Sequence, residues 1–170
     1  MRLKYSFMFG ALAASSAGAA DLTVGIEVPQ LKVAEYHRPY VSVWIERKDQ
    51  SFVNNLAVWY QVKSRGENGE KWLKDMRQWW RKSGRELKFP VDGVTSATRP
   101  VGTHKVTFTE GTAPFAKLPA GEYRLVVEAA RESGGREILS VPFQWPPQKA
   151  QQAQQQGTDE IGLVTLEVKP

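Results

Sequence analysis

The sequence Tyr123-Arg124-Leu125-Val126-Val127-Glu128 begins with an aromatic residue and is rich in apolar and β-branched residues, which is typical of a β-strand. The turn signal Pro119-Ala120-Gly121-Glu122 precedes it. On its other side, Ser133-Gly134-Gly135-Arg136 separates it from Ile138-Leu139 with a Gly-Gly pair that is common in hairpins. The pattern therefore predicts two antiparallel strands, 123–129 and 138–144, that pair directly.

Further short strands are predicted on both sides of this hairpin. Apolar residues alternate with others in 22–28 and 41–45, a denser apolar run spans 56–62, and the remaining candidates are 104–109 and 161–168. Seven short strands with turn signals between most of them predict a mainly β chain, folded as an antiparallel β-sandwich of the immunoglobulin-like kind. Residues 21–170 have the length of a single domain.

One segment has helical rather than strand periodicity. Between Asn68 and Gly84, apolar residues recur at i, i+1, i+4, i+7 and i+8, namely Trp72, Leu73, Met76, Trp79 and Trp80. This spacing predicts one amphipathic helix of about three turns packed on a sheet. Core burial is the favoured role of its tryptophans, although Trp79 or Trp80 could stack on a bound aromatic ring.

The segment 146–158 is polar, rich in glutamine and of low complexity. Such composition lacks the apolar residues that would anchor it in a core, so a mobile loop before the last strand is expected.

The N-terminus has the three parts of a secretory signal peptide. Basic residues Arg2 and Lys4 precede an apolar run at 7–14, and small residues end the segment, with cleavage expected after Ala19 or Ala20. The apolar run is too short for a membrane span, and no other stretch approaches the roughly 18 apolar residues that such a span needs. We expect an exported, periplasmic protein that does not cross the membrane.

Composition narrows the function further. The chain has no cysteine, which excludes disulfides, thiol nucleophiles and cysteine-held iron-sulfur clusters. Without residues 1–20 the chain holds 21 Lys and Arg against 18 Asp and Glu, and these basic residues are spread out apart from 71–85. A nucleic-acid partner therefore has little support.

A short segment resembles a known modification signal. Asp92-Gly93-Val94-Thr95-Ser96-Ala97-Thr98 is similar to the motif at which FAD:protein FMN transferases attach FMN: Asp, two free positions, Ser or Thr, a small residue that is usually Gly, Ala, and the acceptor Thr. The resemblance implies a phosphoester between FMN and Thr98. Ser96 stands where the motif usually has Gly.

Physical roles can be assigned to the residues around Thr98. Ser96 and Ala97 are small enough to enter a narrow transferase cleft, while Asp92 and Thr95 are expected to anchor the loop through backbone hydrogen bonds. Arg99 is expected to pair with the flavin phosphate. The expected product is a flavin carrier for electron transfer, with no catalytic side chain and no metal ligand of its own.

A wider resemblance covers nearly all of the chain after residue 20. The segments that carry this resemblance are 37–46, 72–81, 92–100, 122–125 and 128–132. Through them the chain is similar to the exported family known as domain of unknown function 2271. The resemblance implies the flavin transferase as a partner and, less directly, a membrane redox protein of the PepSY type.

Two other function classes compete with the flavin carrier. An enzyme built on side chains is weakly supported, because His37 and His104 are the only histidines and neither belongs to a metal or nucleophile motif, although either could line a flavin site. The alternative is a non-catalytic periplasmic binding module without flavin, which presents some of its six tryptophans to a ligand or partner.

Overall fold

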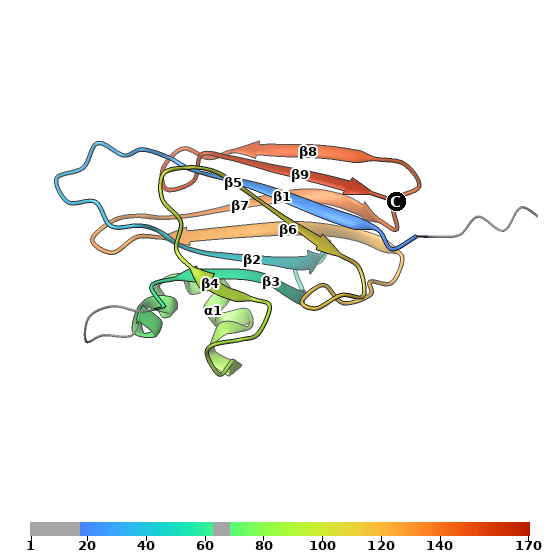
Figure 1. Cartoon of the computed structure of the whole chain (residues 1–170), viewed down its shortest axis with the longest axis horizontal. Coiled ribbons are helices and arrows are strands. Elements are labelled where there is room, and N and C mark those ends of the chain that lie inside the picture. The colour runs from blue at the N-terminus through green and yellow to red at the C-terminus, as the bar shows by residue number, and fades with distance from the viewer. Residues whose placement is uncertain (1–17, 63–68) are drawn as a thin grey trace, which may run out of the picture.

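The computed structural model describes residues 18–62 and 69–170, which form two β-sheets and a small helical region (Figure 1). The elements in chain order are β1 (Asp21–Val28), β2 (Tyr40–Arg47), β3 (Phe52–Tyr60), the 3₁₀ helix η1 (Gly69–Asp75), α1 (Arg77–Lys82), the 3₁₀ helix η2 (Gly84–Glu86), β4 (Thr95–Ala97), β5 (Gly102–Thr109), β6 (Gly121–Ala130), β7 (Arg136–Trp145), β8 (Gln151–Gln156) and β9 (Leu163–Lys169).

The two sheets pack face to face as a sandwich, which confirms the predicted fold class. One sheet has the strand order β5-β1-β9-β8 and the other has the order β4-β3-β2-β6-β7. Each pair is antiparallel except β3 with β4, which is parallel. The predicted hairpin is present, since β6 pairs with β7 over the whole length of both strands.

The main hydrophobic core lies between the sheets. Alternate residues of β1, namely Leu22, Val24 and Ile26, point into it, as do Val41 and Val43 of β2. A period of two is what places one set of side chains on the inner face of each strand. The outer face of β2 is buried as well, because the helical region covers it.

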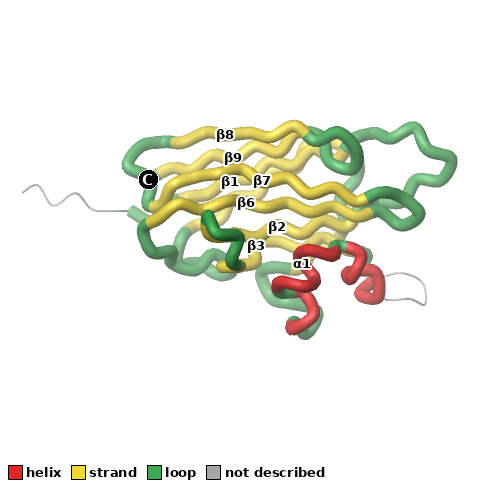
Figure 2. Tube along the Cα trace, turned by 180° about the vertical axis from the view of Figure 1, so that it is seen from behind, coloured by secondary structure: helices red, strands yellow, loops and turns green. Residues whose placement is uncertain are grey.

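The helical region packs on the outer face of the five-stranded sheet and is far from the other sheet (Figure 2). The expected apolar stripe is buried there through Leu73, Met76 and Trp79. The prediction of one amphipathic helix packed on a sheet is confirmed by α1. Its expected length of about three turns was wrong, because the described part of that segment consists of η1, α1 and η2 with a break at Met76, whose ψ is 74°.

A buried carboxylate explains where α1 begins. Glu128 of β6 is fully buried and accepts hydrogen bonds from the N–H groups of Gln78 (3.1 Å) and Trp79 (2.7 Å), while Arg136 pairs with it at 2.8 Å. The first N–H groups of a helix lack partners within the helix, so a carboxylate from the sheet fixes this end of α1. The sequence of the helix alone does not contain that information.

The glutamine-rich segment also differs from the prediction. Within 146–158, which was expected to be a loop, Gln151–Gln156 forms β8 and pairs antiparallel with β9. Backbone hydrogen bonds to β9 define this strand, and its mostly exposed glutamines show no apolar alternation that a sequence analysis could detect. Gln151 adds side-chain hydrogen bonds to the backbone of Gln144 in β7, which tie the edges of the two sheets together.

The predicted signal peptide falls largely outside the described residues, since the description starts at Gly18. Among the described helices, none is long and apolar enough to cross a membrane.

Candidate functional site

The segment that contains Thr98 is anchored along the edge strand β3. The sequence predicted a loop here, but the segment forms the short strand β4, whose Thr95–Ala97 pairs in parallel with Val58–Tyr60. The N–H of Thr98 continues this pairing by donating to the carbonyl of Tyr60 at 3.0 Å. Val94 is buried in the hydrophobic cluster between the five-stranded sheet and the helical region, which holds the segment in place. Ala97 is exposed and Thr98 is half-buried.

The turn before β4 has the conformation that its residues favour. Gly93 has a φ of +72°, in the left-handed region that glycine adopts without strain. The hydroxyl of Thr95 accepts a hydrogen bond from the N–H of Val91 (3.1 Å) and donates to the carbonyl of Val91 (3.0 Å), which closes the turn. Asp92 is exposed, and no described residue donates a hydrogen bond to its carboxylate. Thr95 therefore anchors the turn, whereas Asp92 does not.

Ser96 stands where the acceptor motif usually has glycine. Among the described residues other than glycine, only Gln50 and Ser133 have a positive φ. The backbone at Ser96 is therefore one that any residue can adopt, so the serine introduces no strain at this position.

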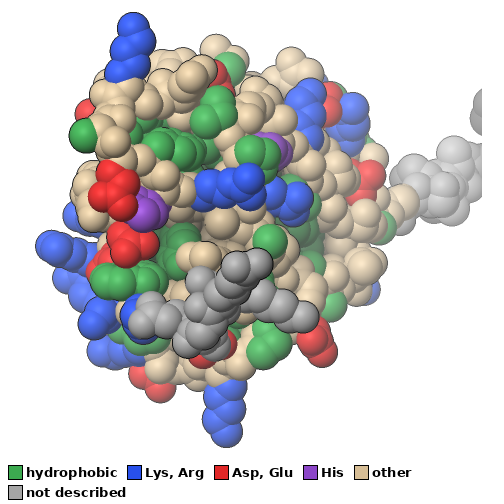
Figure 3. All heavy atoms as spheres, turned by 60° about the vertical axis from the view of Figure 1, so that its left-hand side comes forward, with side chains coloured by type: hydrophobic (Ala, Val, Ile, Leu, Met, Phe, Trp, Pro, Cys, Tyr) green, Lys and Arg blue, Asp and Glu red, His purple; other side chains and the backbone are tan. Residues whose placement is uncertain are grey.

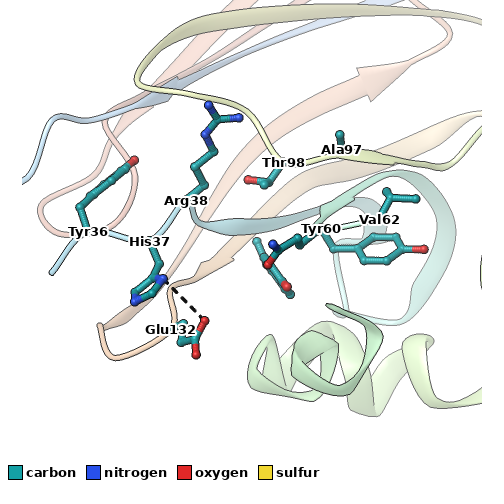
Figure 4. A pocket seen from close by; sticks show the side chains of 10 residues that line it. Tyr36, His37, Arg38, Tyr60, Val62, Ala97, Thr98 and Glu132 are labelled. Carbon is teal, nitrogen blue, oxygen red and sulfur yellow. Dashed lines mark ion pairs between the residues drawn. The ribbon is translucent and has the colours of Figure 1, made fainter. Parts of the chain in front are cut away.

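A pocket of about 590 Å³ lies at the end of the five-stranded sheet where β3, β4 and β6 end and β2 begins (Figure 4). Four chain segments contribute its walls. Its lining residues are Tyr36, His37, Arg38, Tyr40, Tyr60, Gln61, Val62, Ala97, Thr98 and Glu132.

Thr98 presents its side chain to this pocket. Its hydroxyl donates a 2.6 Å hydrogen bond to the carbonyl of Pro39, which leads into β2. This bond fixes the rotamer of Thr98 and leaves the oxygen lone pairs free to face the pocket. Figure 4 shows the hydroxyl pointing toward the side of the pocket from which Arg38 enters.

Two buried tyrosines form one wall of the pocket. Tyr40 and Tyr60 meet edge to face with ring centroids 6.4 Å apart, and Tyr60 makes a similar contact with Phe89 at 6.1 Å. Burial raises the pKa of both tyrosines above the ordinary value of 10.0, although a backbone hydrogen bond at Gln61 acts in the opposite direction on Tyr40. Both rings are therefore neutral at physiological pH and offer aromatic surface to a ligand.

Charged groups lie at the pocket mouth. The Nε2 atom of His37 lies 2.8 Å from Glu35, and its Nδ1 atom lies 3.7 Å from Glu132 of the β6–β7 hairpin (Figure 4). Arg38 is exposed and forms no ion pair with any described residue. Within residues 18–62 and 69–170, no three His, Asp or Glu side chains are placed to hold a metal ion.

The residues predicted to bind a cofactor divide into two groups. Ala97 and Thr98 line the pocket, whereas Asp92, Thr95, Ser96 and Arg99 do not. Arg99 instead lies over the ring of Trp59, which belongs to the main core, with its guanidinium carbon 5.3 Å from the ring centroid. Its Nε atom is buried without a hydrogen-bond partner among the described residues.

The other candidates from the sequence are similarly divided. His37 lines the pocket, but His104 does not, and its Nε2 atom lies 2.7 Å from the carbonyl of Pro100. Trp79 is fully buried, and its indole N–H donates a hydrogen bond to the side-chain oxygen of Asn55 at 2.9 Å. Neither Trp79 nor Trp80 lines the pocket.

The sequence did not single out Tyr36, Arg38, Tyr60 or Glu132 as pocket residues. Tyr36 and Arg38 are distant in the chain from Tyr60 and Glu132, and the pairing of β2 with β3 and with β6 brings these segments together. Arg38 and Glu132 do lie in segments 37–46 and 128–132, which carry the resemblance to a family, and this is the sequence signal that could have indicated them.

Comparison with known proteins gives one match. The family model described as "Predicted periplasmic protein (DUF2271)" matches residues 21–163. No curated protein and no solved structure matches the chain.

Proposed function

The chain belongs to the DUF2271 family of predicted periplasmic proteins, and on that premise we propose that it is an exported flavin carrier with FMN attached covalently to Thr98. The observation that carries the proposal is that Thr98 combines two independent properties. It is the acceptor position of a segment that resembles the flavin transferase motif, and its hydroxyl opens into a pocket with aromatic walls.

The attachment is a phosphoryl transfer from FAD. The Thr98 oxygen forms a bond to the phosphorus of the FMN half, the bond from that phosphorus to the bridging oxygen breaks, and AMP leaves. The hydroxyl proton passes to a base of the transferase or to water. Such transfers depend on positioning and on charge stabilisation, both of which the transferase supplies. The chain must only present the Thr98 oxygen, which its bond to Pro39 orients.

The pocket residues fit the attached group. A volume of about 590 Å³ lies in the range of cofactor sites. Arg38, which has no ion pair with a described residue, is the group suited to the phosphate, in place of Arg99, whose side chain lies over Trp59. Tyr36, Tyr40 and Tyr60 offer aromatic surface to the ring system. The bound flavin would supply the capacity for electron transfer that the side chains lack.

The proposed function also involves two protein partners and export by means of a cleaved signal peptide. The transferase is the first partner, and a membrane redox protein of the PepSY type is the candidate electron donor. Ala20 is buried, and its carbonyl accepts a 2.9 Å hydrogen bond from the N–H of Glu110, which favours signal cleavage after Ala19 over cleavage after Ala20.

The test is the intact mass of the exported protein, produced with and without a flavin transferase. We expect a transferase-dependent gain equal to FMN minus water, absent in Thr98→Val and retained in Thr98→Ser, which keeps the hydroxyl. Undiminished loading of Thr98→Val would refute the assignment of Thr98.

A binding module without flavin is the second candidate, favoured by the same pocket. His37, Arg38 and three tyrosines are suited to an aromatic or anionic small molecule without any covalent bond. Absence of any mass gain with an active transferase, together with a normal fold, would make this the better account.

A further inference from the structure

Of the large hydrophobic side chains that are exposed among the described residues, two line the pocket and two lie close in sequence to pocket residues. The four side chains are Val33 (42%), Tyr36 (38%), Val62 (38%) and Val101 (44%). Tyr36 and Val62 line the pocket itself. Val33 lies three residues before Tyr36, and Val101 lies three residues after Thr98. We call these four residues the apolar rim. Exposed apolar patches bordered by polar groups commonly mark interaction sites.

Charge is distributed unevenly along the chain. Segment 71–88 carries seven basic and two acidic side chains, a net charge of +5, whereas the rest of 21–170 carries fourteen basic and sixteen acidic ones, a net charge of −2. Within this segment Lys74 and Arg77 are exposed and form no ion pair with a described residue. We call residues 71–88 the basic segment.

The basic segment adjoins the pocket. The N–H of Gly69, at the start of η1, donates to the carbonyl of Gln61 in the pocket wall at 3.1 Å. Glu132 lines the pocket and also a second groove, shared with Trp72, Asp75 and Arg77. Figure 3 shows this end of the molecule, where hydrophobic side chains lie among Lys and Arg side chains and acidic groups lie beside a histidine.

We propose that the apolar rim and the neighbouring basic segment form a docking surface for an acidic protein domain. The rim supplies the desolvated centre of the contact, and the basic residues attract and orient a partner of opposite charge. Its use in electron transfer rests on the proposed function, because the partner would cover the mouth of the pocket at Thr98. Docking itself requires no flavin.

Other occupants fit less well. A second copy placed by two-fold symmetry would bring one basic segment close to the other. Proteins that bind membrane surfaces insert Trp, Phe or Leu, and the rim has none of these among its four residues. Charge and rim composition thus favour an acidic protein.

The test uses two synthetic acidic peptides, one of glutamate alone and one with leucine at every fourth position. Both are titrated into isotope-labelled Thr98→Val protein, which cannot carry FMN at this site, so the result is independent of flavin loading. We expect amide shifts at the apolar rim and in residues 69–88, tighter binding of the leucine-containing peptide, and at least tenfold weaker binding when salt rises from about 50 to about 500 mM.

Three double variants localise the effect. Lys74→Glu with Arg77→Glu should weaken binding at least tenfold, whereas Lys117→Glu with Lys149→Glu, an equal charge change at the opposite end, should weaken it less than threefold. Tyr36→Ser with Val62→Ser should remove the advantage of the leucine-containing peptide. Equal losses in both charge variants, binding to anionic phosphatidylglycerol vesicles without binding to either peptide, or dimerisation in sedimentation would each overturn the proposal.

Discussion

The two ends of the sandwich use aromatic residues in opposite ways. At the end where β6 begins and β7 finishes, Phe115, Phe143 and Trp145 are buried and contact one another, with ring centroids 5.2 Å and 6.4 Å apart. At the other end, Tyr40 and Tyr60 are buried too, but together with the exposed Tyr36 they line the pocket at Thr98. We call the first end, where three rings pack into the main core and two of them, Phe143 and Trp145, also line grooves, the closed end, and we call the second the open end.

The difference shows how one fold separates stability from function. At the closed end, the polar atoms of two buried rings have internal partners, since the Tyr123 hydroxyl donates to the carbonyl of Pro119 at 2.6 Å and the Trp145 indole donates to Glu110 at 3.1 Å. At the open end, the Thr98 hydroxyl makes one internal hydrogen bond and keeps its oxygen lone pairs, and Arg38 forms no ion pair with a described residue. Substitutions should therefore have separable effects at the two ends.

The largest effect is expected from Phe115→Ala at the closed end. Phe115 is fully buried, so its truncation removes apolar contacts, leaves a cavity and should cost about 3–5 kcal/mol in the free energy of unfolding. Tyr36→Ala at the open end is the control and should cost about 0.5 kcal/mol or less, because Tyr36 is exposed. Denaturant unfolding measures both. Similar losses would show that the open end is as important to the core as the closed end.

The next effect concerns Glu46, a buried carboxylate under the helical region. It accepts hydrogen bonds from Lys82 (2.6 Å), Trp44 (2.8 Å) and Arg124 (2.9 Å). Burial opposes its charged form, but these donors outweigh burial and hold the pKa of Glu46 below the ordinary value of 4.5. Glu46→Gln should cost about 3 kcal/mol at neutral pH, because it leaves two basic groups without their partner.

Glu46 should also make the free energy of unfolding depend on pH in the acid range. Because its folded pKa is lowered, Glu46 contributes stability above pH 4.5 and loses that contribution as pH falls from 4.5 through the folded pKa. Unfolding measured across this range should therefore show a shallower acid decline in Glu46→Gln than in the native protein. Glu86→Gln, whose side chain is 78% exposed, is the matched control at neutral pH and should leave stability within about 0.5 kcal/mol. An unchanged acid slope in Glu46→Gln would refute the role of this carboxylate.

The sequence predicted the architecture better than the site. Alternation identified the strands with apolar inner faces, because burial of one face leaves a period of two in residues such as Leu22, Val24 and Ile26. It missed β4 and β8, whose backbone pairing leaves no apolar pattern. The break at Met76 and the pocket depend on Glu128, Tyr60 and other residues distant in the chain, so local propensity could not predict them.

A smaller effect should distinguish the roles of Arg38 and Arg99. Arg38→Gln should slow FMN loading or leave the attached flavin more mobile, as measured by the loading time course and by flavin fluorescence anisotropy, because it removes the proposed phosphate partner. Arg99→Gln should leave loading unchanged and cost about 1 kcal/mol of stability, because it loses the contact with Trp59. The reverse outcome would return the phosphate role to Arg99.

The smallest effect on the fold is expected at Asp92. Its carboxylate is exposed and has no described hydrogen-bond donor, so Asp92→Ala should change the free energy of unfolding by no more than about 0.5 kcal/mol. Asp75→Ala, another exposed acid without an ion pair to a described residue, is the matched control and should behave the same way in unfolding. FMN loading should distinguish the two. Asp92→Ala should slow loading, because Asp92 belongs to the motif but does not hold the turn together, so its remaining role is to be recognised by the transferase. Asp75→Ala should load normally. Equal loading of both variants and the native protein would show that the resemblance at Asp92 has no functional content, even if Thr98 is the acceptor.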